Sequence, residues 1–144
     1  MCECVFCKII KKESPCHLIY ESDTILSFLD IEPINEGHVL IIPKVHASTI
    51  DKIPLEVLTD IMGFAQKIVK ALTEVYGMKG YSIMQNGGEF CDFGHFHVHI
   101  FPRYKEDGFG WTYVSEERKV NSEIAERWDL KKQIESFVLR KIYW

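Results

Sequence analysis

The segment His95-Phe96-His97-Val98-His99-Ile100-Phe101 alternates imidazole rings with apolar side chains. Period-two alternation is typical of a half-buried β-strand, because successive side chains point to opposite faces of a sheet. We therefore predict a strand over residues 95–101, with the apolar side chains in the core and three imidazoles on the other face. Neighbouring imidazoles would lie about 6.6 Å apart, at about 3.3 Å per residue.

This segment holds three of the six histidines of the chain, which favours a functional role over a polar strand face that happens to use histidine. One functional alternative is a catalytic zinc site, with two histidines of the strand and a third ligand from elsewhere. The other is nucleophilic catalysis, in which an imidazole attacks phosphorus and later leaves it. The residues alone leave both open.

The composition is that of a soluble globular protein, with 144 residues, 47 % of them apolar. This length suits one domain, and no apolar stretch approaches the roughly 20 residues of a transmembrane helix. The N-terminus lacks the basic and apolar regions of a signal peptide, so we expect a cytoplasmic protein without a membrane partner. The net charge of −4 disfavours duplex nucleic acid, which needs a basic footprint.

Short apolar runs bounded by turn residues predict four further strands, at residues 18–21, 25–29, 38–42 and 81–85. The first three follow one another closely, which favours an antiparallel meander. The chain is therefore predicted to be of mixed α and β type.

Two helices are also predicted. The first runs from Pro54, which suits a first turn, to Gly77, which suits a C-terminal stop. Apolar residues recur along it at helical spacing, namely Leu58, Ile61, Met62, Ala65, Ile68, Val69, Leu72 and Val75. The second covers about residues 129–141, with Ile134, Phe137 and Val138 on one side.

Several segments together resemble the histidine triad (HIT) family, in its bacterial form. Residues 95–101 match the hallmark His-φ-His-φ-His-φ-φ, in which φ is apolar. Other segments of the family occur in the same order in this chain, at residues 4–10, 28–33, 37–46 and 102–109. The resemblance implies an α+β fold with a five-stranded, mainly antiparallel sheet and packed helices. Residues 1–144 would form one HIT domain, with a core over about 4–110 and a helical extension over about 113–144.

The resemblance also implies roles for individual residues. The middle histidine of the family is the nucleophile, so His97 would form a nucleotidyl-histidine that water hydrolyses. His99 would bind the phosphate and assist the leaving group, and Asp30 would bind the ribose hydroxyls. The implied nucleotide-binding set is Phe6, Ile9, Phe28, Asp30, Ile31, Asn86, Gly94, His97 and His99. Without the resemblance, the four apolar members are core residues, and Asp30 and Asn86 belong to turns.

The residues just before the histidine segment depart from the family pattern. Many members have Gly-Gln-Ser/Thr-Val there, which contacts the phosphate, whereas this chain has Glu89-Phe90-Cys91-Asp92-Phe93-Gly94. Asp92 stands close to the expected hydroxyl, where a carboxylate would repel an anionic phosphate. We therefore expect Asp92 to point away or to orient a histidine, and Gly94 to allow close approach of the backbone.

The pair Cys4-x-x-Cys7 has the spacing of half a zinc site, although such pairs can also be redox-active or accidental. The resemblance implies that His46 and His95 complete a closed Cys₂His₂ site, which would be structural. The chain has five cysteines, but disulfides are not expected in a reducing compartment.

The implied reaction is hydrolysis or transfer at the α-phosphate of a purine nucleotide conjugate. Candidate substrates are an adenosine phosphoramidate, an adenylylated amine and a dinucleoside polyphosphate, of which only the last would be helped by magnesium. The resemblance further implies a homodimer joined through the long helix and an edge strand.

Two other functions stay open: a nucleotide-binding module with little turnover, and a zinc hydrolase whose triad holds the metal. His17 and His38 are assigned no role. Arg103 and Lys105 are expected either to meet a distal phosphate or to lie in a solvated loop.

Overall fold

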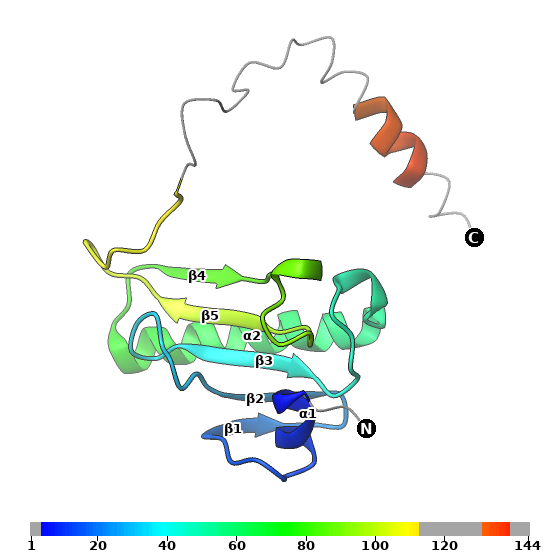
Figure 1. The fold of residues 1–144 in the computed structure, drawn as a ribbon. Helices are drawn as coiled ribbons and strands as arrows, with labels where there is room; N and C mark the ends of the chain where they lie inside the picture. The colour runs from blue at the N-terminus through cyan, green and yellow to red at the C-terminus, as the bar shows by residue number, and fades with distance from the viewer. Residues whose placement is uncertain (1–3, 113–130, 139–144) are drawn as a thin grey trace. The chain divides into compact units, whose positions relative to one another are not determined.

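The computed structural model describes residues 4–112 and 131–138. The chain divides into two compact units, Met1–Phe109 and Gly110–Trp144. The first unit contains a five-stranded sheet of order β1-β2-β3-β5-β4, in which every neighbouring pair is antiparallel (Figure 1). Its strands are β1 Leu18–Glu21, β2 Ile25–Leu29, β3 Val39–Pro43, β4 Tyr81–Met84 and β5 Val98–Pro102. The predicted α+β fold and the antiparallel meander are therefore confirmed.

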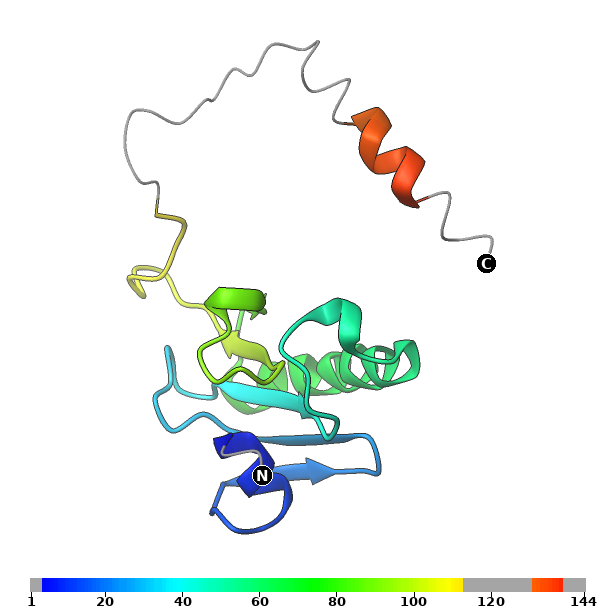
Figure 2. The ribbon, with the colours of Figure 1, turned by 45° about the vertical axis from the view of Figure 1, so that its right-hand side comes forward.

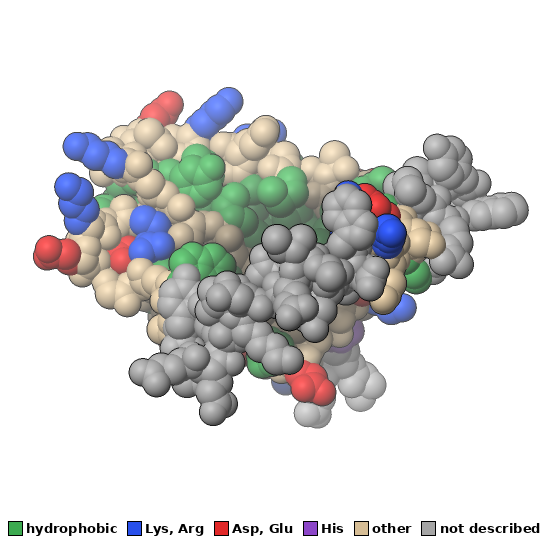
Figure 3. Space-filling view, turned by 90° about the horizontal axis from the view of Figure 1, so that it is seen from above, with side chains coloured by type: hydrophobic (Ala, Val, Ile, Leu, Met, Phe, Trp, Pro, Cys, Tyr) green, Lys and Arg blue, Asp and Glu red, His purple; other side chains and the backbone are tan. Residues whose placement is uncertain are grey.

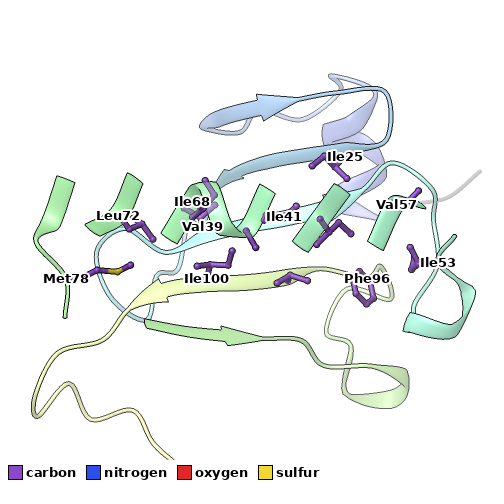
Figure 4. Packing of buried hydrophobic residues seen from close by; sticks show 13 residues of the cluster. Ile25, Val39, Ile41, Ile53, Val57, Ile68, Leu72, Met78, Phe96 and Ile100 are labelled. Atoms are coloured by element: carbon purple, nitrogen blue, oxygen red, sulfur yellow. The ribbon is translucent and has the colours of Figure 1, made fainter. Parts of the chain in front are cut away.

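The helix α2, Leu55–Tyr76, packs on one face of this sheet. Pro54 lies directly before its first residue, and Gly77 ends it with φ +59° and an N–H that donates to Thr73 O at 2.9 Å, as predicted for a left-handed C-terminal stop. Its buried residues recur every three or four positions: Val57, Ile61, Ala65, Ile68 and Leu72. These side chains meet the sheet in a continuous core (Figure 4). Met62 and Val75, which also follow the predicted spacing, are exposed.

A short helix, α1 Val5–Ile10, lies on the opposite face of the sheet (Figure 2). It packs against alternate side chains of β2 and β3 in a second core cluster, the α1 cluster. This cluster consists of Phe6, Ile9, Leu26, Phe28, Leu40 and Ile42. The intervening residues Ile25, Val39 and Ile41 belong to the core between α2 and the sheet, the α2 cluster. The central strands are thus buried on both faces, and α1, which the sequence did not predict, forms one wall of the second face.

The histidine segment differs from its prediction at its start. Sheet pairing begins at Val98 rather than at His95, and the Phe96 N–H donates instead to Ala47 O, at 2.6 Å. The pairing of β3 with β5 ends at Ile41 and Val98, whereas the last two residues of β3, Ile42 and Pro43, are paired with β2. The alternation itself is confirmed, since Phe96, Val98 and Ile100 all lie in the α2 cluster.

The remaining elements are short. Two 3₁₀ turns, η1 Ile50–Lys52 and η2 Gly88–Phe90, lie in the connections that precede α2 and β5. In the second unit, residues 131–138 are helical, which confirms that part of the helix predicted over 129–141; the ends of that prediction lie outside the described residues. Among the described residues, no helix has the length and apolarity needed to cross a membrane.

Candidate functional site

Two groups of titratable side chains lie on the sheet face that carries α1. The first, called here the metal cluster, consists of Cys4, Cys7, His46 and His95. The second, called here the reaction cluster, consists of Asp30, His38, His97 and His99. The predicted triad is therefore divided between two groups, with His95 in one and the other two histidines in the second.

The metal cluster brings together residues that are far apart in sequence. The sulfur of Cys7 lies 3.3 Å from His46 Nδ1 and 3.7 Å from His95 Nδ1, and the sulfur of Cys4 lies 3.6 Å from His95 Nδ1. The two Nδ1 atoms are 3.2 Å apart. A tetrahedral zinc ion, with bonds of about 2.0–2.3 Å, would separate its ligand atoms by roughly 3.3–3.8 Å. These four side chains could therefore bind zinc.

The protonation of His95 also fits a metal ligand. Its Nε2 lies 2.8 Å from Pro43 O, and because a carbonyl only accepts, Nε2 must carry the hydrogen. The lone pair of the neutral ring is then on Nδ1, which faces both sulfurs and His46. Burial lowers the pKa of His95, which favours this neutral form. A backbone carbonyl that fixes the tautomer of a ligating histidine is common at metal sites.

His97 shows the opposite tautomer. Its Nδ1 lies 2.7 Å from His95 O, so the hydrogen is on Nδ1 and the lone pair of the neutral ring is on Nε2. The Cys91 thiol donates to the same carbonyl at 3.3 Å. His95 thus supplies its side chain to the metal cluster and its backbone carbonyl as the acceptor that orients His97.

His99 is held by His38, a residue to which the sequence assigned no role. The Ile34 N–H donates to His38 Nδ1 at 3.0 Å, so the neutral His38 carries its hydrogen on Nε2. That Nε2 lies 2.9 Å from His99 Nδ1 and donates to it. The neutral His99 must then carry its own hydrogen on Nε2.

Burial favours the neutral form of these two rings. Burial lowers the pKa of His38 against the opposing effect of Asp30. Burial is also the main cause that lowers the pKa of His99 to about 4, assisted by the nearby His97 and His38 and opposed by Asp30 and Asp92. At neutral pH the chain from Ile34 N–H to His99 is therefore a series of hydrogen-bond donors.

Asp30 completes the reaction cluster. Its Oδ2 lies 3.5 Å from His38 Nε2 and 3.8 Å from His99 Nδ1, and its Oδ1 accepts the Glu32 N–H at 2.9 Å. By position alone, Asp30, His38 and His99 could also hold a metal ion. However, the hydrogen on His38 Nε2 points at His99, so the lone pair that a metal needs is not available there. The hydrogen bonds favour a proton-donating chain over a second metal site.

The residues predicted to bind the nucleoside differ in their exposure to solvent. Phe6, Ile9 and Phe28 are buried in the α1 cluster, whereas Ile31 is 83 % exposed. Phe6 nevertheless borders the reaction cluster, because its ring centroid lies 5.2 Å from that of His97. The predicted set is therefore a buried aromatic wall with one exposed apolar residue beside Asp30.

The loop before the histidine segment contributes an aromatic ring that the sequence did not single out. Phe93 is half exposed, and its ring centroid lies 4.9 Å from Phe6 and 5.8 Å from His97. Gly94 follows with φ +60°. Asp92 is exposed and acts to raise the pKa of His99. Asn86 is exposed, and among the described residues its side chain makes no hydrogen bond to a histidine.

Register could have revealed His38. Leu40 is paired with His99, so Leu40, Ile42 and His38, which directly precedes β3, face the same side of the sheet as His99. Predicting that pairing requires knowledge of which strands are neighbours, and the order β3-β5-β4 is not evident from the local sequence.

Comparisons with known proteins place this geometry in a family. The family model described as HIT domain matches residues 11–106. A fission yeast protein, named "Adenosine 5'-monophosphoramidase hnt1" from Schizosaccharomyces pombe, is 39 % identical over 115 residues, which cover 75 % of this chain and 82 % of that protein.

Solved structures agree with the fold. The crystal structure of a HIT family protein from Bacillus anthracis has a TM-score of 0.81 and 33 % identity, covering 93 % of this chain and 96 % of that one. A structure described as a Zn-bound histidine triad family protein from Mycobacterium smegmatis has a TM-score of 0.69 and 32 % identity, covering 81 % and 86 % of the two chains.

Proposed function

Because this chain belongs to the HIT family, we propose that it hydrolyses or transfers nucleotide conjugates, with Nε2 of His97 attacking the α-phosphorus. One observation carries this proposal: the bond from His97 Nδ1–H to His95 O, at 2.7 Å, leaves Nε2 as the basic nitrogen. A nucleophile needs an aimed lone pair, and in the neutral ring this bond places the lone pair on Nε2.

The first step forms the bond between His97 Nε2 and phosphorus and breaks the bond to the leaving group, which takes the electron pair and a proton from solvent. The histidine becomes cationic in this nucleotidyl intermediate, and His95 O accepts from its Nδ1–H throughout. Water then attacks phosphorus and loses a proton to solvent, and the bond between phosphorus and Nε2 breaks, which releases the nucleotide and restores the neutral ring.

His99 stabilises the charge that develops on the phosphate. Its Nε2–H is a donor because His38 donates to its Nδ1 at 2.9 Å, and donors fixed before the reaction are the most effective. Asp30, within 3.5 Å of His38, leaves carboxylate lone pairs to bind ribose hydroxyls. Ile31 and Phe93 are the exposed apolar surfaces on which a purine would rest.

We assign a structural zinc ion to Cys4, Cys7, His46 and His95. The ion would supply a crosslink and no chemistry of its own, because these four side chains would fill all positions of a tetrahedral site. It would fasten α1, which carries Phe6, to the segment that carries His97. Magnesium is proposed only as an aid with dinucleoside polyphosphates.

The chain is further proposed to form a homodimer through α2 and the edge strand β4. This surface exposes large apolar side chains, among them Leu55, Met62, Tyr81 and Ile83, and a shallow depression is lined by Met62, Val69, Tyr81 and Ile83. Figure 3 shows hydrophobic side chains gathered on the face seen from above β4. Light scattering tests this proposal, with a dimer expected and a monomer against it.

A comparison of substrates tests the proposed reaction. Adenosine phosphoramidate, an adenylylated amine and a diadenosine polyphosphate would each be incubated with the full chain. The name of the fission yeast relative makes the first the substrate of choice, and we expect it to be turned over fastest. Tight binding of all three without turnover would instead support a binding module.

A further inference from the structure

The motif that follows β5 builds a compact hydrogen-bonded hub around the Asp107 carboxylate. Arg103 donates to it through Nε at 2.6 Å and through Nη2 at 3.0 Å. The N–H groups of Tyr104 and Phe109 donate to the same carboxylate, at 3.2 and 3.1 Å. The side chain of Asp107 is almost fully buried, and the Arg103 guanidinium holds the pKa of this carboxyl well below the usual range.

Arg103 uses four of its five guanidinium N–H groups in this hub. Besides Asp107, its guanidinium donates to Ser82 Oγ at 3.1 Å and to the Phe109 carbonyl, and it lies 4.8 Å over the Phe109 ring. This arrangement argues against its role as a ligand of a distal phosphate. The motif must therefore serve the protein in another way.

The side chain of Asn35 links the hub to the connection between β2 and β3. Its amide nitrogen donates to Pro102 O at 2.8 Å and to Asp107 Oδ2 at 3.0 Å. Both hydrogens of the amide are thus used, on acceptors that lie far along the chain. A bridge of this kind fixes the position of Asn35 relative to the end of β5.

The backbone of Asn35 controls the turn that presents His38. The His38 N–H donates to Asn35 O at 3.2 Å, and the Ile34 N–H donates to the His38 ring at 3.0 Å. On the other side, a Cβ on Gly37, whose φ is +87°, would come within 2.8 Å of the Tyr76 ring. The turn is thus held between the hub and α2, with little room to move.

We propose that Asn35, anchored by Asp107, is a positioning residue for the reaction: it holds the 34–38 turn so that His38 keeps its hydrogen on Nε2 and donates to His99. The inference rests on the proposed function for its catalytic consequence. Its structural half, the tautomer of His38, can be measured without any substrate.

The test compares Asn35→Ala with Ser82→Ala in the full-length protein. The first removes both donors to the end of β5. The second removes one acceptor of Arg103 and leaves the contacts of Asn35 intact, so it controls for general loosening of the hub. Asn35→Ser, which keeps a hydroxyl donor, serves if the alanine variant does not fold, with folding checked by urea unfolding.

Two readouts are needed. The ¹⁵N resonances of the His38 ring report which nitrogen carries the hydrogen, and steady-state kinetics with adenosine phosphoramidate separate kcat from KM. In Asn35→Ala we expect a mixture of His38 tautomers and a fall in kcat of about tenfold with KM changed by less than about twofold. In Ser82→Ala we expect the wild-type resonances and kcat.

An Asn35 variant that folds, keeps the single His38 tautomer and keeps wild-type kcat would overturn the proposal. Equal effects of both substitutions would also overturn it, because they would indicate only a structural role for the hub. If the wild-type protein turns over no nucleotide conjugate, the proposed function fails, and the ring resonances still decide whether Asn35 orients His38.

Discussion

The metal cluster and the reaction cluster draw on the same short segment, yet their histidines carry hydrogen on opposite ring nitrogens. His95 has its hydrogen on Nε2, directed at Pro43 O, and aims Nδ1 at two sulfurs. His97 has its hydrogen on Nδ1, directed at His95 O, and keeps Nε2 basic. Two histidines that are two residues apart thus adopt different tautomers, because each ring donates to a different backbone carbonyl.

The difference teaches that a histidine motif does not define a site until its hydrogen bonds are known. A ring fixed with a lone pair toward sulfur suits metal binding, whereas a ring that donates to another histidine, as His38 does, does not. The boundary between the clusters is the His95 peptide unit. The first two predictions each remove one side of this comparison and ask whether the other persists, and the next two test the hydrogen bond and the charge within the reaction cluster.

The largest effect is expected for His97→Ala. Removing the proposed nucleophile should lower kcat/KM by at least about 10³-fold, while the zinc content stays near one per chain, because the proposed metal ligands are untouched. Kinetics and metal analysis of the same preparation measure the two. His17→Ala, at an exposed position, is the control and should match the wild type. Loss of zinc from the His97 variant would contradict the division into two clusters.

The opposite experiment is Cys4→Ser, which removes a ligand of the metal cluster. Because a structural zinc ion contributes directly to folding, the variant should lose its zinc and its Tm should fall by about 10 °C. Cys16→Ser is a matched control, since Cys16 is also a half-buried free thiol but lies outside the cluster. Calorimetry measures the Tm of each variant, and equal Tm values for Cys4→Ser and Cys16→Ser would contradict a metal site.

A smaller effect is expected for His38→Ala, which removes the donor to His99. We expect kcat to fall by about 10²-fold, less than for loss of His97, with zinc content unchanged. The reason is that His99 would no longer be restricted to the tautomer that donates from Nε2. Wild-type kcat in this variant would show that the hydrogen bond at 2.9 Å has no part in turnover.

The mildest test changes only pH. The folded protein should protonate His99 near pH 4, whereas an unfolded histidine takes up a proton near 6.5. Between these values the unfolded state binds more protons, so stability should fall as the pH is lowered through that range. An NMR titration of the His99 ring measures the midpoint. A midpoint near 6.5 would mean that burial does not dominate over Asp30 and Asp92.

Much of this arrangement could be predicted from local sequence. Period-two alternation correctly placed Phe96, Val98 and Ile100 in the core, and Gly77 ends its helix as expected. The predicted start of β5 was wrong because the strand begins where its pairing with β3 begins, at Val98 and Ile41, and strand order is a property of the whole fold. For the same reason His38 was missed: its partner lies 61 residues away.

The site was only partly predictable. The structure brings the four proposed metal ligands together, and those residues were named by resemblance and spacing. Phe93 and the Asn35–Asp107 bridge were not foreseen, because both depend on how loops pack rather than on a repeated pattern. Charge alone suggested that Arg103 could meet a phosphate, but its internal partners in the hub are invisible without coordinates.

The central claim is that His97 attacks while His95 belongs to the metal cluster. The most direct test is to quench the reaction of the full chain with adenosine phosphoramidate and to locate any adenylyl group by mass spectrometry of its peptides. We predict an adenylyl group on His97, in protein that contains one zinc ion per chain. Turnover without any adenylyl-protein, or an adenylyl group on His95, would contradict the account.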